Sequence, residues 1–428
     1  SFIPWLLATA FLHSSKTQIK EKTLINWNYV LACLMFISVI FGTFITRSGV
    51  LISVHAFSNG NIGTYLLIGL LIFTFLFMYI GIKNIEYFKT SRKVENILML
   101  IFTAIFLIYI SLSPDMSIDS LKGVLVIGVT VGIIYGLVAV GISLIYTGLD
   151  VVNFSHGEFF MIGAFTGLTV YNFLVDGDLI YAIFPEAYGV VGYIIGLFFA
   201  FVLMGLFGVL IERIFLRPLT KKGGGYTVAG MGIIICGFGL SVVLINVAYL
   251  IWNPVAKPFP AELGLPMEIG GLFLPITYIW MIVVGLSVAA GLWFFLNKTK
   301  MGLGIRAVAY SKDVSNLVGI NVPLYISIIF GIACAIAGIG GTLVGPTYQV
   351  VVFMGYIILM KAFAAAVVGG FGNLPGAIVG GFTVGIFETA SSFYISGSHK
   401  DLYAFLLMIV VLMIKPTGFF GVQVKMKA

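Results

Sequence analysis

The segment GLDVVNFSHGEFF (Gly148–Phe160) places an aspartate, an asparagine, a histidine and a glutamate within nine residues of an otherwise strongly apolar chain. Long apolar runs flank it on both sides, near 121–147 and 158–175. A continuous apolar run of about twenty residues is long enough to cross a bilayer as a helix. The runs are continuous rather than alternating, which favours helices over the strands of a membrane barrel. The polar segment therefore predicts a break between two membrane-spanning helices.

The composition of the whole chain extends this interpretation. Its 428 residues are 60% hydrophobic and 9% charged, with a mean hydropathy of +1.14. These values exclude an ordinary soluble domain and predict an all-α, polytopic transmembrane bundle of about 12 helices. The apolar runs lie near 1–14 (truncated), 26–46, 62–82, 97–112, 121–147, 158–175, 188–211, 228–252, 273–296, 322–345, 355–371, 374–395 and 402–415. Three scattered cysteines, Cys33, Cys236 and Cys334, argue against a disulfide framework, and we expect no metal site.

The charges predict the topology. The chain carries a net charge of +7, and 18 of its 23 basic residues lie in four loops and the C-terminal tail. Acidic loops alternate with these basic ones, as the positive-inside rule requires, and this pattern puts the C-terminus in the cytoplasm. A nucleic-acid partner is not expected, since no basic face with interleaved aromatic residues accompanies the charge. The four basic loops hold Lys16, Lys20 and Lys22; Lys83, Lys89, Arg92 and Lys93; Arg213, Arg217, Lys221 and Lys222; and Lys298, Lys300, Arg306 and Lys312.

Glycine spacing separates two parts of the chain. Upstream of about residue 83 glycine is sparse, whereas downstream of about residue 120 it recurs four residues apart, at Gly128, Gly132 and Gly136 and at Gly381 with Gly385. Small residues at this spacing let helix backbones approach closely, so the second part is expected to form a tightly packed bundle.

Two stretches of the second part resemble each other. GIIYGLVAVGISLIY, a polar break and GEFFMIGAFTG parallel GIACAIAGIGGTLVG, a break and GYIILMKAFAAAVVGG. The loop charges put the two breaks on opposite sides of the membrane. This arrangement predicts inverted repeats, as in many transporters.

The polar segment itself allows two interpretations. Ser155-His156-Gly157-Glu158 fits the capping box S-x-x-E, in which serine and glutamate cap the start of a helix at the membrane boundary. The functional alternative is a broken helix whose polar end, with Asn153, His156 and Glu158, lines a translocation path. His156 has no second ligand at helical spacing and does not predict a metal site.

Lys361 lies inside the apolar run GYIILMKAFAAAVV. An ionisable residue within a membrane segment is costly and by default suggests a function. Lys361 is therefore a further candidate for the translocation path, where it would meet a substrate carboxylate or pair with Glu388. The favoured alternative is that its side chain extends to the outer interface near Gly355.

Several motifs in one order resemble the LIV-type branched-chain amino acid ABC transporter permeases. They run from GIIYGLVAVGISLIYTGLDVVNFSHGEFFMIGAF through ERIFLRPL, MGLGIRAVAYSKDVSNLVGINV, KAFAAAVVGGFGNLPGAIVGG and IKPTGFFG, and the resemblance covers about residues 121–428. It implies a bacterial inner-membrane transport subunit for branched-chain or related amino acids, not an enzyme, and without a cofactor. The implied partners are a second permease, two cytoplasmic ATPases, which hydrolyse ATP, and a periplasmic substrate-binding protein.

The longest cytoplasmic connection, Met301–Val322, predicts a short surface helix. Its expected apolar side is Leu303, Ala307, Val308, Val314, Leu317 and Val318, with Arg306, Lys312 and Asp313 exposed. A solvated basic loop is the alternative. The family resemblance instead implies the helix that couples the permease to the ATPase, through Arg306, Ala307, Lys312, Asp313, Val314, Leu317 and Gly319.

The N-terminal part resembles a different family. PWLLATAFLHS, EKTLINWN and FGTFITRSGVLISVHAF are similar to the WWD-domain haem lyases of c-type cytochrome biogenesis. The resemblance implies that His13 matches a transmembrane haem ligand and His55 a periplasmic one. The family's tryptophan-rich haem-binding motif, which would end just before Pro4, is absent, so we expect little retained haem binding. A haem-handling protein of cytochrome c biogenesis is the alternative function.

We therefore interpret the chain as a fusion. Residues 1–93 are a truncated haem-lyase-like membrane segment, residues 94–120 a junction of unclear origin, and residues 121–428 the permease domain. An origin in sequence assembly is favoured over an evolved bifunctional protein, because the first part lacks its reactive centre.

Overall fold

The computed structural model describes residues 7–11, 14, 25–47, 101–108, 110, 113, 117–176, 180–222, 226–261 and 263–421. The chain divides into two compact units, Ser1–Asn96 and Ile97–Ala428. The main described element of the first unit is α2 (Ile25–Arg47), near whose start the Ser14 hydroxyl donates a hydrogen bond to the Asn28 side-chain oxygen. The two proposed haem ligands, His13 and His55, lie outside the described residues.

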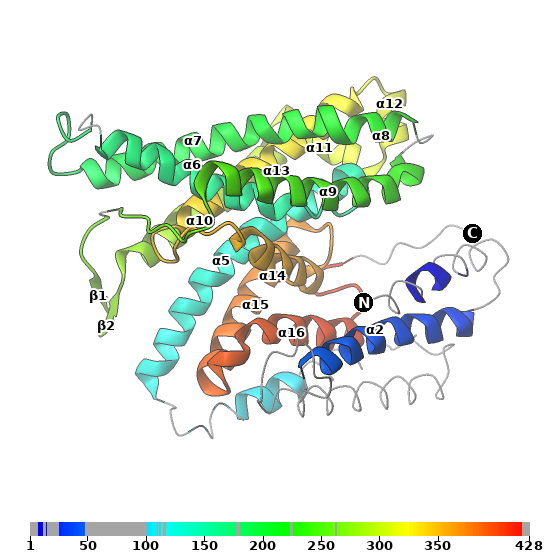
Figure 1. Cartoon of the computed structure of the whole chain (residues 1–428), viewed down its shortest axis with the longest axis horizontal. Coiled ribbons are helices and arrows are strands. Elements are labelled where there is room, and N and C mark those ends of the chain that lie inside the picture. Colours follow the sequence, from blue (N-terminus) through cyan, green and yellow to red (C-terminus); the bar gives the residue numbers. More distant parts are fainter. Residues whose placement is uncertain are drawn as a thin grey trace. The chain divides into compact units, whose positions relative to one another are not determined.

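The described part of the second unit is almost entirely helical (Figure 1). In chain order its elements are α5 (Ile118–Leu149), α6 (His156–Asp176), α7 (Tyr188–Ile211), the π-helix η2 (Glu212–Leu216), α8 (Arg217–Lys222), α9 (Tyr226–Trp252), β1 (Met267–Ile269), β2 (Leu272–Leu274), α10 (Ile276–Lys298), α11 (Lys300–Tyr310), α12 (Lys312–Leu317), α13 (Val322–Val344), α14 (Met354–Gly369), α15 (Leu374–Tyr394), η3 (Gly397–His399) and α16 (Lys400–Ile414). The two strands form one small antiparallel hairpin that the apolar pattern did not predict.

The predicted helical membrane fold is confirmed. Within the described residues seven helices are long and apolar enough to cross a bilayer, or up to eight if a bent pair counts as one span. That pair is α14 and α15, which meet at 117° across a short break, whereas the sequence predicted two independent spans there. The predicted total of about 12 helices is not confirmed, since the runs at 62–82 and most of 1–14 lie outside the described part of the chain.

Helices α5 and α15 pack backbone to backbone through glycines. A Cβ atom placed on Gly381 would lie 2.4 Å from the Cα of Gly136, and one placed on Gly385 would lie 2.4 Å from the Cα of Gly132. No side chain fits between atoms so close. The close approach expected from the four-residue glycine spacing is therefore confirmed, and Gly128 lies against Ile386 as well as Gly385.

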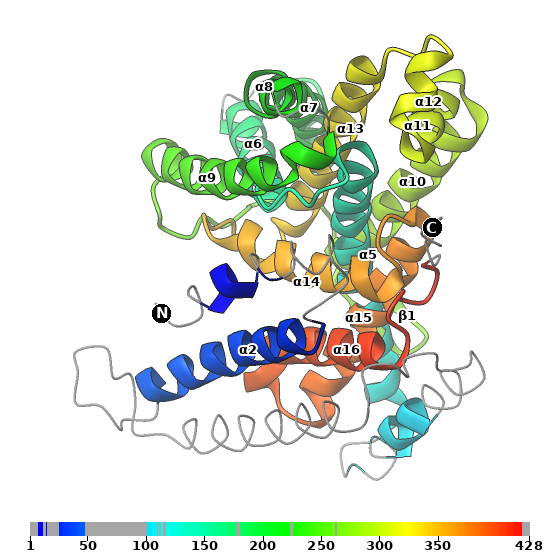
Figure 2. The same cartoon turned by 90° about the vertical axis from the view of Figure 1, so that its right-hand side faces the viewer.

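The helices differ in how deeply they are buried. For α5, α6 and α13, 72%, 61% and 67% of the apolar window is buried within the protein, against 28% for α9 and 22% each for α10 and α16. Figure 2 shows α9 and α10 on opposite flanks of the bundle, with α5 and α13 between them. The exposed apolar side chains of the flanking helices, such as Val242 and Phe294, are suited to contact lipid.

A contact between two glycines joins the starts of α6 and α14. A Cβ atom on Gly157 would lie 2.4 Å from the carbonyl oxygen of Gly355, and one on Gly355 would lie 2.3 Å from that of Gly157. These glycines open the second halves of the two similar stretches. Reciprocal contact between corresponding residues is what a two-fold relation between repeats produces, and the inverted repeat itself stays a prediction.

The charged residues of ERIFLRPL connect the end of α7 to the start of α13. The chain passes through the π-helix η2, and Arg217 pairs there with the buried Glu212 at 3.0 Å. The Ser327 hydroxyl donates to Glu212 at 2.6 Å, and Arg217 donates to the carbonyl of Pro323 at 2.9 Å. A buried charge is tolerated when it is paired and hydrogen-bonded, so this motif fixes the packing of the two helices.

Candidate functional site

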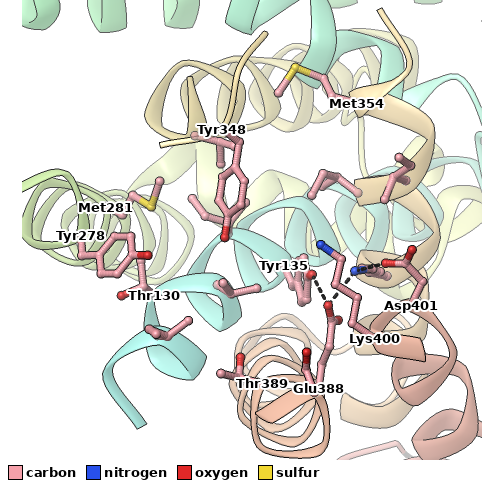
Figure 3. Close-up of a pocket in the computed structure, with 18 of the residues that line it drawn as sticks. Thr130, Tyr135, Tyr278, Met281, Tyr348, Met354, Glu388, Thr389, Lys400 and Asp401 are labelled. Atoms are coloured by element: carbon pink, nitrogen blue, oxygen red, sulfur yellow. Dashed lines mark hydrogen bonds and ion pairs between the residues drawn. The ribbon is translucent and has the colours of Figure 1, made fainter. Parts of the chain in front are cut away.

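A cavity of about 570 Å³ lies within the second unit. Its wall is formed by α5, α10, α14, α15, the start of α16 and the segment between α13 and α14 (Figure 3). Most of the lining is apolar, including Ile134, Met281 and Ile358, and a few polar side chains converge on one part of it. This combination, at a volume within about 300–1,000 Å³, is typical of small-molecule sites.

Two of the predicted path residues form an ion pair in this cavity. The Lys361 ammonium lies 2.6 Å from Oε1 of Glu388 and 2.7 Å from Oδ1 of Asp401. The side chains of Lys361 and Glu388 are 6% and 8% exposed, whereas Asp401 is 64% exposed. The favoured prediction that Lys361 extends to the interface is therefore wrong, and the alternative pairing with Glu388 is confirmed. Bringing the charges together offsets the cost of burying each of them.

Tyr135 of α5 completes the buried side of this network. Its hydroxyl donates to Oε1 of Glu388 at 3.2 Å, and its ring centroid lies 5.7 Å from the Lys361 ammonium, within cation–π range. Oε1 thus accepts two hydrogen bonds. Oε2 of Glu388 is also buried and has no hydrogen-bond partner in the described part of the chain.

Lys400 and Tyr348 add polar groups to the cavity lining. Lys400 is exposed, and among the described residues no carboxylate lies within ion-pair distance of its ammonium. Figure 3 shows it directed toward the same part of the cavity as Glu388 and Asp401. Burial raises the pKa of the Tyr348 hydroxyl, so this residue faces the cavity as a neutral group. No sequence pattern predicted a role for Tyr135, Tyr348, Lys400 or Asp401.

The other predicted path residues do not line this cavity. Asn153, His156 and Glu158 are fully buried where α5 gives way to α6, and they form a separate polar cluster. Ser241 of α9 donates to Oε1 of Glu158 at 2.8 Å. Both ring nitrogens of His156 lack a hydrogen-bond partner within the described residues. The structure thus divides the five candidates between two places in the bundle.

The predicted capping box does not form. The backbone N–H and the hydroxyl of Ser155 both donate to Oδ1 of Asn153, at 3.2 and 2.9 Å, and the Glu158 side chain bonds Ser241 instead of returning to Ser155. Asn153 therefore caps this turn, and α6 begins at His156 rather than 158. Gly141 of α5 packs against the His156 ring. Only glycine fits at this position, since a Cβ atom there would lie only 2.4 Å from Nε2 of His156.

The predicted surface helix in 301–322 is two short helices, α11 and α12, separated at Ser311, whose hydroxyl caps the second. The predicted single apolar side is wrong, because Val308 is buried while Leu303, Val314 and Leu317 are exposed. The other exposed residues of the predicted coupling set are Arg306, Asp313 and Gly319, and Ala307 is half-buried.

Lys312, expected to be exposed, is instead largely buried. Its ammonium pairs with Asp150, the residue that ends α5 in a left-handed conformation at φ 59°. The opening polar segment is thereby tied to α12. The chain thus has a physical connection between its α5–α6 break and the surface formed by α11 and α12.

Comparison with known proteins identifies the second unit. A family model described as "Branched-chain amino acid transport system / permease component" matches residues 124–413. The chain belongs to this permease family. It is 34% identical over 302 residues to the high-affinity branched-chain amino acid transport system permease protein LivH of Escherichia coli K12, covering 69% of this chain and 93% of LivH. It is 33% identical over 305 residues to BraD of Pseudomonas aeruginosa, covering 69% and 94%.

The N-terminal part has its own relatives. The chain is 45% identical over 74 residues to the cytochrome c-type biogenesis protein CycK of Rhizobium meliloti, which covers 17% of this chain and 11% of CycK. The similarity thus extends over a small piece of that cytochrome c-type biogenesis protein. No solved structure gives a significant match to the chain.

Proposed function

We propose that this chain is a transmembrane permease subunit of an ABC importer for branched-chain or related amino acids in the bacterial inner membrane. The observation that carries the proposal is the cavity of about 570 Å³, in which acidic and basic groups meet an apolar wall inside the helical bundle of a LivH-type permease. Amino acids with aliphatic side chains combine the same two chemical characters. The five residues Asn153, His156, Glu158, Lys361 and Glu388 remain our candidates for the translocation path.

The charge distribution supports an orientation in which the cavity opens outward. Its polar part lies at the start of α16 and the ends of α15 and α13. The opposite ends of the helices carry Arg213, Lys298 and Lys415, and basic loops remain on the cytoplasmic side. The C-terminus is then cytoplasmic. A cavity that opens outward can receive substrate from a periplasmic binding protein.

The surface of α11 and α12 supports docking of the ATPase. At the predicted cytoplasmic side it exposes Leu303, Val314 and Leu317, apolar residues that water solvates poorly, beside the cation Arg306. ATP binding on the partner chain would move this surface, and the Lys312–Asp150 ion pair would carry the movement to the α5–α6 break. We propose the same partners as the family resemblance implies: a second permease, two ATPases and a binding protein.

The division of the chain follows from the same proposal. Residues 121–428 form the permease, residues 94–120 a junction, and residues 1–93 a haem-lyase-like segment. The permease part requires no cofactor.

Transport by reconstituted components tests the proposal. The chain, its ATPases and its binding protein are placed in proteoliposomes, and uptake of radiolabelled leucine is followed with and without ATP. ATP-dependent uptake that needs every component is expected. Robust uptake by the purified chain alone, or no uptake of any branched-chain amino acid by the complete system, contradicts the proposal.

A further inference from the structure

The four charged residues of the cavity leave two groups available to a ligand. Lys361, Lys400, Glu388 and Asp401 contribute two positive and two negative charges, so the cavity as a whole is neutral. Lys361 is already held by both carboxylates, at 2.6 and 2.7 Å. Lys400 is not held by any carboxylate in the described residues. The available cation is therefore Lys400.

The available negative group lies beside it. Asp401 follows Lys400 in the first turn of α16 and is 64% exposed, so a ligand can reach its carboxylate. Behind it, Oε2 of Glu388 is buried without a hydrogen-bond partner in the described chain. Since Oε2 has almost no accessible surface, Glu388 contributes negative charge behind Asp401 and makes no direct contact with a ligand. Lys361 holds both carboxylates toward one point, which places them together on one side of the cavity.

We propose that this corner of the cavity is a binding site for the zwitterionic head group of an α-amino acid. The ligand's carboxylate binds the Lys400 ammonium, and its ammonium binds the exposed carboxylate of Asp401. Its aliphatic side chain lies against the apolar wall that includes Ile134, Met281 and Ile358. Lys361 and Tyr135 are positioning residues that orient Glu388. This inference rests on the proposed function and deepens it, since the permease itself then recognises both charged groups of the substrate.

The neutral balance of the cavity favours a zwitterion over an ion. An anionic ligand would meet the two carboxylates, and a cationic ligand would meet the two ammonium groups, so each would gain one attraction and suffer one repulsion. A zwitterion in the proposed orientation gains both attractions. The site therefore discriminates against analogues that lack either charge.

Binding to the permease without the binding protein tests the inference. The purified permease–ATPase complex is placed in nanodiscs, and radiolabelled leucine is displaced by unlabelled leucine, by leucinamide, which has no carboxylate, or by isocaproate, which has no amino group. The concentration of each analogue needed to displace half of the label is expected to be at least about tenfold higher than that of leucine. This is the usual effect of losing a hydrogen bond to a charged group.

Two substitutions assign the charges. Lys400→Gln should weaken leucine binding about tenfold and leave leucinamide binding unchanged, and Lys400→Arg should bind leucine like the wild type. Asp401→Asn should weaken leucine binding and leave isocaproate binding unchanged. Lys122→Gln and Asp119→Asn are the matched controls, because this exposed ion pair lies at the start of α5 and outside the cavity lining. A loss of packing would affect leucine and both analogues alike.

Three results overturn the inference: leucine binding by Lys400→Gln equal to wild type, competition by either analogue equal to that of leucine, or no leucine binding by the wild-type complex. Uptake by complete proteoliposomes is measured in parallel. If the wild type transports leucine in any of these cases, the head-group site is wrong while the importer function stands. If it transports no branched-chain amino acid, the importer function fails as well.

Discussion

Replacing Gly381 by alanine should destabilise the bundle, because α5 leaves no room for even one methyl group. The added Cβ would lie 2.4 Å from both the Cα and the N of Gly136 and 2.6 Å from the carbonyl oxygen of Gly132. Ordinary contact begins at 3.4 Å, so the two helices must separate by 3.4 − 2.4 = 1.0 Å. These are backbone atoms, which cannot rotate away as a side chain would.

The expected loss is about 2 kcal/mol. Overpacking of a tight interior costs about 1–3 kcal/mol, and unyielding backbone places this site near the upper limit. The gain in helix propensity on replacing glycine by alanine returns about 0.5–1 kcal/mol. The matched control is Gly123→Ala on the partner helix α5, where a Cβ meets nothing within 4 Å, so only the gain applies.

Thermal unfolding in detergent measures both variants. In a background with Cys33→Ser and Cys236→Ser, the fully buried Cys334 is the only thiol, and a thiol-reactive dye reports its exposure on unfolding. Gly381→Ala should lower the Tm by about 4–8 °C, and Gly123→Ala should leave it unchanged or slightly higher. A Tm of Gly381→Ala equal to or above the wild type would refute the reasoning from backbone contact.

Three further predictions follow from the site and the division of the chain. Glu388→Gln should cost about 2–3 kcal/mol in the same unfolding assay, less than the loss of a whole buried pair because Lys361 keeps its second carboxylate, and an unchanged Tm contradicts it. Arg306→Glu or Val314→Asp should abolish substrate-stimulated ATPase activity and transport while changing stability by less than about 0.5 kcal/mol, so retained coupling in both variants would exclude α11 and α12 as the docking surface. Deletion of residues 1–96 should leave leucine uptake intact, since the family match begins later, and loss of uptake by an inserted, folded remainder would show that the two units work together.

Much of the helical fold could be predicted from apolar runs. The expected spans 188–211 and 322–345 agree with α7 and α13 within a residue. The bend between α14 and α15 was missed because hydropathy shows how long an apolar segment is and carries no information on the direction of the helix that it forms. The chain turns there at Gly370, whose φ of 109° is a conformation open to glycine, and the break of four residues allows a reversal inside what the sequence shows as two ordinary runs.

The candidate site was found only in part. Lys361 and Glu388 were identified because an ionisable residue stands out against an apolar run. Lys400 and Asp401 did not stand out, since charges at the start of a span are common. Their role depends on the position of α16 beside α14 and α15, which is a tertiary property. A pair of opposite charges directly preceding the last apolar run was the available signal.

The glycine contact between α5 and α15 also constrains how the protein is made. Among the long helices of Ile118–Ile414, α5 is the first and α15 the next to last, and 374 − 149 − 1 = 224 residues separate them. At a synthesis rate of about 5–20 residues per second, α5 waits in the membrane for roughly 10–45 s before its partner emerges from the ribosome. Over that interval its bare glycine stripe faces lipid or an insertion factor. A ribosome that stalls before α15 therefore leaves a chain in which this glycine interface is unpaired, and we expect membrane quality control to act on such a chain.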